Sequence, residues 1–229
     1  EASSGTTQFD FDALGQLQTS TNARGQVTRY SFDVLSRLTE RVDAQGTSAE
    51  VVNTRTWDDS PFGIGALASR SNANGRFNET YAYDHLGRPQ SRTMSTNLSG
   101  FSATGSYRIQ FGYDTQGRLG TVTYPGNIAF THRYTTHGYI DQLRQGSTVL
   151  EQYNQIDAFG NVTRKTAGNN LITTRGFDAR TGELTSIATG LAATPKSIQD
   201  LDYRWKQDGM LEWRADRQGT SGTADDRIE

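Results

Sequence analysis

The sequence predicts an all-β protein, built as an antiparallel meander of β-hairpins. Three observations support this fold class. A short unit of the form aromatic–Asp–x–x–Gly–x–aliphatic recurs along the chain, turn residues return about every ten positions, and apolar residues alternate with polar ones between the turns. No stretch has a convincing helical period. Joined copies of such hairpins predict one curved strip of sheet with an aromatic-lined face.

The recurring unit is clearest at its first copy, which runs from Phe11-Asp12 through Gly15 to Leu17. Further copies begin at residues 32, 57, 83, 113, 134, 156, 177 and 205, which makes nine. Their steps range from 21 residues (32 − 11) to 30 residues (113 − 83). The shortest step is the basic repeat. The longer steps predict loop insertions, which we place at residues 58–66 and 92–106.

The unit has the chemistry of a hairpin turn. Aspartate at the first turn position accepts hydrogen bonds from backbone N–H groups two residues on, and glycine three residues later adopts the positive φ that ends a type I turn with a bulge. The aromatic and the aliphatic residue then pair across the hairpin. The predicted turn residues are Asp12, Gly15, Asp33, Asp58, Asp84, Gly87, Asp114, Gly117, Gly138, Asp157, Gly160, Asp178, Gly182 and Gly209.

Some copies depart from the unit. The replacements are Ser36 for glycine, Pro89 for the aliphatic residue, Thr135 and Lys206 for aspartate, and Ile156 for the aromatic residue. A second series of turn signals lies between the first, and it includes the segments 22–25, 43–46, 72–75 and 216–219. Between turns, Tyr107, Ile109, Phe111 and Tyr113 lie two apart and are expected on one face of a strand.

Composition excludes several classes of function. The net charge is −2, from 23 basic and 25 acidic residues, with no concentrated basic tract, so a nucleic-acid partner is not expected. No apolar stretch approaches the roughly 20 residues needed to span a bilayer, so membrane insertion is not expected. Cysteine is absent, which excludes disulfides, thiol nucleophiles and Cys-ligated metals.

Catalytic, cofactor and metal sites are also not expected. The turn geometry explains the repeated aspartates, and the nonapeptide pattern of calcium-binding β-rolls is absent. His132 and His137 are five apart, so a strand would direct them to opposite faces. His85 lies inside a turn, and no G-x-S-x-G nucleophile motif occurs. We therefore predict a protein without enzymatic activity.

The clearest copies of the unit resemble the YD repeat of the Rhs family. They are Tyr113-Asp114-Thr115-Gln116-Gly117-Arg118-Leu119 and Tyr83-Asp84-His85-Leu86-Gly87-Arg88. That family includes bacterial Rhs toxins, the B and C components of insecticidal toxin complexes, and teneurins. The resemblance divides the chain into a leading segment (1–8), a repeat region (9–214) and a polar connector (215–229). The small, polar and charged residues 218–229 are expected to be flexible.

The resemblance implies a β-strip that spirals into a hollow shell. In bacterial members the shell encloses a C-terminal toxic polypeptide, so the implied partners are the rest of the parent shell and its cargo. Some members carry a self-cleaving segment marked by Asp-Pro; this sequence has no Asp-Pro, so self-cleavage is not carried over. The expectation is a mid-shell wall segment of a bacterial protein that is secreted or displayed on the cell surface.

A second hypothesis is a module for cell-surface adhesion or for binding a glycan or receptor, through the insertions at 58–66 and 92–106. The two hypotheses share one physical expectation. Strand edges and an aromatic face that are exposed to water favour association. We therefore expect this chain either to self-associate or to curl and cover that face.

Overall fold

The computed structural model describes residues 5–72, 76–96, 105–218 and 226–228. The regular structure of these residues consists of nineteen β-strands, which confirms the predicted all-β class. The first ten are β1 (Gln8–Phe11), β2 (Leu17–Thr21), β3 (Val27–Phe32), β4 (Leu38–Asp43), β5 (Val51–Trp57), β6 (Leu67–Asn72), β7 (Phe77–Tyr83), β8 (Pro89–Thr96), β9 (Gly105–Tyr113) and β10 (Leu119–Tyr124). The others are β11 (Ile128–Tyr134), β12 (Ile140–Gln145), β13 (Thr148–Ile156), β14 (Val162–Ala167), β15 (Ile172–Phe177), β16 (Leu184–Leu191), β17 (Thr194–Trp205), β18 (Leu211–Asp216) and β19 (Asp226–Ile228).

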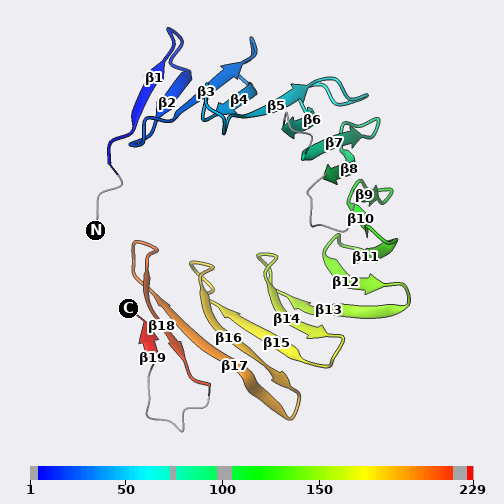
Figure 1. The fold of residues 1–229 in the computed structure, drawn as a ribbon. Helices are drawn as coiled ribbons and strands as arrows, with labels where there is room; N and C mark the ends of the chain where they lie inside the picture. The colour runs from blue at the N-terminus through cyan, green and yellow to red at the C-terminus, as the bar shows by residue number, and fades with distance from the viewer. Residues whose placement is uncertain (1–4, 73–75, 97–104, 219–225, 229) are drawn as a thin grey trace. The chain divides into compact units, whose positions relative to one another are not determined.

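The chain divides into two compact units. One consists of Glu1–Gly112 with Val122–Asn127, and the other of Tyr113–Thr121 with Ile128–Glu229. In the first unit, β1 to β9 pair in sequence order, each antiparallel to the next (Figure 1). In the second, β11 to β19 do the same. This order of pairing is the predicted meander.

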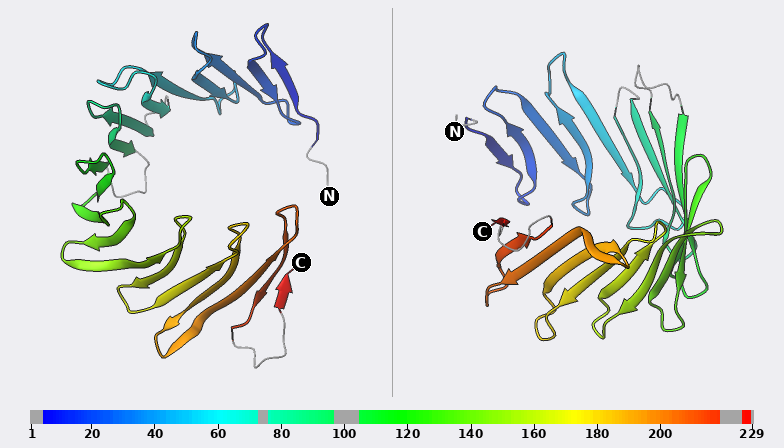
Figure 2. Two further views of the ribbon diagram at one scale, coloured as in Figure 1. Left: turned by 180° about the vertical axis from the view of Figure 1, so that it is seen from behind. Right: turned by 90° about the horizontal axis from the view of Figure 1, so that it is seen from below.

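Within each unit, the turns of the repeat all lie at the same edge of the sheet. Every copy of the repeat joins an odd-numbered strand to the next even-numbered one, and each further hairpin returns the chain to its starting edge. The other series of turns occupies the opposite edge, as the adjacent hairpins of either unit show in Figure 2. One repeat therefore contributes two strands to the sheet and places one turn at each of its two edges.

Few side chains are fully buried. The buried apolar residues are Val42, Ala68, Val122, Leu201 and Ala215, and the buried polar ones are Glu79 and Ser91. Several large apolar side chains lie exposed at the tips of the repeat turns, including Leu14, Val34, Leu35, Leu86 and Phe159. Each hairpin therefore depends for its stability on its two neighbours, as in other repeat proteins, and not on a common thick core.

The strands alternate as the sequence predicts. In β9, Tyr107, Ile109 and Phe111 are partly buried, whereas Arg108 and Gln110 between them are exposed. The described residues contain no helix long and apolar enough to cross a membrane.

Three segments differ from the sequence-based expectation. The insertion expected at 92–106 is shorter, because β8 continues to Thr96 and β9 starts at Gly105; residues 97–104 lie outside the described part of the chain. The segment 215–229 is not only a connector, since 215–216 complete β18 and β19 pairs with β18 through Arg214 and Ile228. Regular pairing thus extends beyond the predicted end of the repeat region at residue 214.

The third difference concerns the turn expected at 43–46. There the backbone N–H of Thr47 donates to the carbonyl of Ala44, and Ala44 itself has a positive φ of 52°. The Asp43 carboxylate does not cap this turn; it binds Arg41 and Asn53 instead. The turn expected at 72–75 falls on residues 73–75, outside the described residues.

Candidate functional site

The repeat turn is built around the aspartate carboxylate. At Asp84, one carboxylate oxygen accepts hydrogen bonds from the backbone N–H groups of Leu86 (2.9 Å) and Arg88 (3.0 Å). The N–H of Gly87 donates to the Asp84 carbonyl at 2.8 Å, and Gly87 has a φ of 75°. These bonds define a type I turn that ends in a left-handed residue.

The same arrangement occurs at Asp12, Asp33, Asp114 and Asp157. The left-handed position is filled by Gly15, Gly117 and Gly160, and by Ser36, which has a φ of 63°. The turn at Asp178 is one residue longer, because the N–H of Gly182 reaches the Asp178 carbonyl across an extra residue. The extra residue preserves the left-handed glycine, since Gly182 has a φ of 74°.

Three copies use other caps. The hydroxyl of Thr135 accepts a hydrogen bond from the Tyr139 N–H at 3.2 Å, and Gly138 closes that turn. The turn from Lys206 to Gly209 forms without an aspartate at its start; Asp208 accepts from the Met210 N–H instead. Asp58 has a φ of 65° and caps the longer loop by accepting from the Gly65 N–H at 2.6 Å.

The bulge that follows each turn sets the aromatic residue opposite the aliphatic one, as the sequence predicts. Eight copies show this pair in register: Phe11–Leu17, Phe32–Leu38, Trp57–Leu67, Tyr83–Pro89, Tyr134–Ile140, Ile156–Val162, Phe177–Leu184 and Trp205–Leu211. The register shifts at this pair in each case, which directs the two side chains to a fixed position beside the turn.

An arginine after the glycine position completes three of the turns. The Nε of Arg37, Arg88 and Arg118 donates to the second carboxylate oxygen of Asp33, Asp84 and Asp114 at 2.7, 2.8 and 2.7 Å. The side-chain hydrogen bond from Arg88 is the main cause that lowers the pKa of Asp84 below its ordinary value. Both carboxylate oxygens are thereby occupied, so these aspartates are structural groups and not free acids or bases.

A second set of contacts joins consecutive repeats at four places among the described residues. Polar aromatic side chains donate a hydrogen bond to the carbonyl oxygen of the aliphatic residue in the preceding copy. The pairs are Trp57 with Leu38 (3.0 Å), Tyr83 with Leu67 (2.8 Å), Tyr134 with Leu119 (2.9 Å) and Trp205 with Leu184 (2.7 Å). The repeat pattern did not predict these links, although the choice of Tyr or Trp over Phe at this position is a visible signal for them.

At two of these contacts between repeats, the turn arginine also packs against the aromatic ring. The guanidinium carbon of Arg118 lies 4.2 Å from the ring centroid of Tyr134, and that of Arg37 lies 5.1 Å from the ring of Trp57. Both distances suit a cation–π interaction. One arginine thus holds the turn of its own repeat and the aromatic ring of the following one.

Two acidic clusters, one around the buried Glu79 and one around the half-buried Glu151, were not predicted from the sequence. Glu79 is fully buried and accepts hydrogen bonds from Arg70, Arg92 and the Tyr81 hydroxyl. Glu151 has a similar set, with Lys165 at 2.6 Å and the Tyr153 hydroxyl at 2.7 Å. The shared Glu-x-Tyr spacing places both side chains on one strand face, and it could have indicated these clusters.

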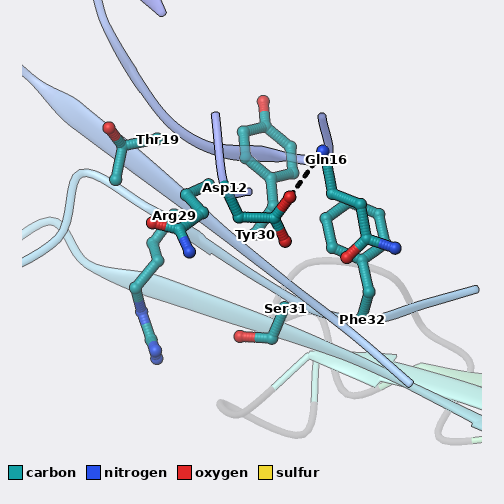
Figure 3. A pocket seen from close by; sticks show the side chains of 8 residues that line it. Asp12, Gln16, Thr19, Arg29, Tyr30, Ser31 and Phe32 are labelled. Atoms are coloured by element: carbon teal, nitrogen blue, oxygen red, sulfur yellow. Dashed lines mark hydrogen bonds between the residues drawn. The ribbon is translucent and has the colours of Figure 1, made fainter. Parts of the chain in front are cut away.

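A polar pocket of about 370 Å³ lies beside the first repeat turn, between Asp12 and β3 (Figure 3). The one carboxylate that lines the pocket belongs to Asp12. It accepts a hydrogen bond from the backbone N–H of Gln16 at 2.8 Å and is therefore engaged in the turn. Arg29 at the rim pairs with Glu40. No group of three His, Cys, Asp or Glu side chains within the described residues could hold a metal ion.

Comparisons with known proteins agree with this geometry. Residues 11–48 match the RHS Repeat family. No curated protein matches the chain in sequence. A crystal structure of TcdB2–TccC3 is similar with a TM-score of 0.71 and 16% identity, over 95% of this chain and 12% of that one.

Two further solved structures show the same fold. A crystal structure of TcdB2–TccC3–TEV has a TM-score of 0.68 and 17% identity, over 95% of this chain and 12% of that one. The Photorhabdus luminescens Tc holotoxin pore has a TM-score of 0.69 and 16% identity, over 96% and 12% of the two chains. The chain therefore spans only a small part of these proteins. Residues 11–48 thus match an RHS repeat, and the chain as a whole shares the fold of these toxin-complex structures.

Proposed function

We propose that this segment is a non-catalytic stretch of wall in a β-shell that encloses a C-terminal toxin or effector. The observation that carries the proposal is the chain of links between consecutive repeats, such as Trp57 to Leu38 and Tyr134 to Leu119. Their polar groups hold hairpins together and are not free for chemistry. A strip joined in this way is suited to serve as a continuous wall.

The solved structures with this fold support the proposal. One of them is a Tc holotoxin pore, and this chain covers 12% of the similar chain in it. A wall of that size requires many more hairpins than the nineteen strands of this segment. The proposed partners are therefore the rest of the parent shell and its enclosed cargo, in a bacterial protein that is secreted or displayed at the surface.

Protection of the cargo is the test. The full parent protein is treated with a protease, and the C-terminal region is followed by mass spectrometry. We expect that region to resist cleavage in the wild type. The double variant Trp57→Ala, Trp205→Ala lacks two of the links that hold neighbouring repeats together. We expect its C-terminal region to be cleaved faster than that of the wild type.

The Tyr139→Phe variant is the control for this experiment, since Tyr139 is 46% exposed and lies at a turn. It should leave the cleavage rate unchanged. Equal cleavage of the C-terminal region in wild type and double variant would contradict the wall function, as would a parent protein whose repeats enclose no polypeptide when imaged by cryo-electron microscopy.

A second candidate function is recognition of a glycan or receptor through the loop at 58–66. The specific observation is that Phe62 and Ile64 at this loop are 63% and 92% exposed. Screening the intact protein against glycan and receptor panels tests it. Binding that is lost when 61–64 are replaced by a Gly-Ser linker supports recognition, whereas binding that persists, or no binding at all, contradicts it.

Self-association is proposed for the isolated segment. The exposed apolar tips of the repeat turns, such as Val34 and Leu86, lie along one edge of the first unit. Burying them between copies would remove apolar surface from water. Sedimentation of the 229-residue chain at increasing concentration should show dimers or larger species; a monomer at all concentrations would contradict this.

A further inference from the structure

Two arginines face each other across neighbouring strands of the first unit. Arg55 on β5 lies directly opposite Arg70 on β6 in the strand register. Like charges at directly opposed positions repel each other. A pocket of about 210 Å³ lies over the pair, and Arg41, Asp43, Asn53 and Phe77 contribute to its lining.

The carboxylates near this pocket are already engaged. Asp43 binds Arg41 at 2.6 Å and accepts from the Asn53 amide at 3.1 Å. Glu79 is surrounded by Arg70, Arg92 and the Tyr81 hydroxyl, the last at 2.5 Å. Each acid therefore has a complete set of partners, and neither is left to neutralise Arg55.

Arg55 differs from the other arginines at the pocket. Its Nη1 atom is buried and has no hydrogen-bond partner among the described residues, whereas Arg41 and Arg70 are both paired with a carboxylate. A buried donor without an acceptor is costly, and a charged one more so. The pocket thus has one more guanidinium than it has acids to match.

We propose that this pocket binds the carboxylate of an acidic side chain from a polypeptide that lies against this face of the sheet, with Arg55 as its main ligand. A guanidinium matches a planar carboxylate through two parallel hydrogen bonds. The same face already pairs the guanidinium groups of Arg41 and Arg70 with the carboxylates of Asp43 and Glu79. The volume accommodates a carboxylate and several waters of roughly 30 Å³ each.

The identity of the polypeptide as an enclosed cargo rests on the proposed wall function, but the affinity of the pocket for a carboxylate does not. The test therefore uses the 229-residue chain and a capped hexaglutamate peptide, titrated by calorimetry at fixed ionic strength. We expect the Arg55→Gln variant to bind the peptide at least tenfold more weakly than the wild type. If the parent protein protects its C-terminal region but this chain does not bind the peptide, the carboxylate-binding proposal is overturned and the wall function is not.

The matched control is Arg24→Gln, which removes the same charge from an exposed turn of the first unit. It should change peptide affinity by less than twofold. Equal losses in Arg55→Gln and Arg24→Gln would show general charge attraction and overturn the proposal. Inorganic phosphate serves as a second probe, and binding of phosphate without binding of the peptide would overturn the assignment to a carboxylate.

A measurement of stability separates a ligand-binding role from a structural one. Without added carboxylate, the Arg55→Met variant should unfold at a urea concentration equal to or above that of the wild type, because the substitution removes a buried donor without a partner and the repulsion from Arg70. A clearly lower urea midpoint for Arg55→Met would mean that Arg55 supports the fold itself, and it would overturn the proposal.

Discussion

The indole Nε1 of Trp57 donates a hydrogen bond to the carbonyl oxygen of Leu38 at 3.0 Å, across 19 residues of sequence. The two residues occupy different slots of consecutive repeats, since Trp57 is the aromatic residue of one copy and Leu38 the aliphatic residue of the copy before it. Arg37 also lies over the Trp57 ring. The Trp57 side chain therefore contacts both the turn arginine and the strand backbone of the preceding repeat.

Removing one such link should destabilise the chain measurably. The Tyr134→Phe substitution deletes the 2.9 Å hydrogen bond to the Leu119 carbonyl and retains the ring beneath Arg118. We expect a loss of about 1 kcal/mol in the free energy of unfolding, measured by urea denaturation. Tyr139→Phe in the neighbouring turn is the control, and an equal loss in both variants would contradict a specific role for the link.

The left-handed serine predicts a stabilising change. Ser36 has a φ of 63° at the position where other copies have glycine. Holding a non-glycine residue in this conformation destabilises the folded state by about 1–2 kcal/mol. Glycine removes this strain, but it also increases the conformational entropy of the unfolded chain, which offsets part of the gain. Ser36→Gly should therefore raise the free energy of unfolding by about 0.5 kcal/mol.

Val34→Gly in the same turn is the matched comparison, because Val34 is fully exposed and its φ is not positive. There the added freedom of the unfolded chain is the main effect, and the variant should be less stable than the wild type. If both glycine variants shift the urea midpoint in the same direction, backbone strain at Ser36 is not the cause.

Stability should fall in acid because of the turn aspartates. The hydrogen bonds from Arg88 lower the folded-state pKa of Asp84 below 3.8, so the unfolded chain binds protons more readily in this range. The contribution of the carboxylate is complete above the unfolded pKa of about 3.9 and is lost as the pH falls through the folded value. Urea midpoints measured from pH 7 to pH 2.5 should show this decline.

Asp84→Asn separates the charge from the cap. An asparagine already caps one turn of this chain. The side-chain oxygen of Asn22 accepts hydrogen bonds from the backbone N–H groups of Arg24 (3.0 Å) and Gln26 (3.1 Å). The variant should retain the turn, lie below the wild type in stability near pH 7, and approach it below about pH 4. A gap that is constant with pH would rule out a contribution from the charge.

The buried cluster at Glu79 predicts the largest single loss. Glu79→Gln retains the size of the side chain but removes the charge that matches Arg70 and Arg92. The carboxylate is buried but the Arg70 and Arg92 side chains are 40% and 45% exposed, so we expect a loss of about 2 kcal/mol, typical of hydrogen bonds to a charged group. Glu212→Gln is the control, because its pair with Arg204 is exposed and should contribute under about 1 kcal/mol. Similar losses in the two variants would contradict the special position of Glu79.

The elements that follow local rules were predictable from sequence. The turn at Asp84 and the Tyr83–Pro89 pair depend on residues within one hairpin, so their pattern is visible in a short window. The bond from Trp57 to Leu38 and the ions around Glu79 depend on which hairpins become neighbours. β19 was missed for the same reason, because its pairing with β18 comes from an available strand edge and not from a repeat motif.

The two-strand period of the repeat also has a consequence for how such chains change length. Each link reaches only to the preceding copy, and each copy returns the chain to the same edge of the sheet. Deleting or duplicating one complete copy would therefore leave the direction of every remaining strand and the edge of every remaining turn unchanged. Half a copy would reverse the strand direction and exchange the two edges. Genes for such strips can thus lengthen or shorten by recombination in whole repeats, without a new fold having to arise at the junction.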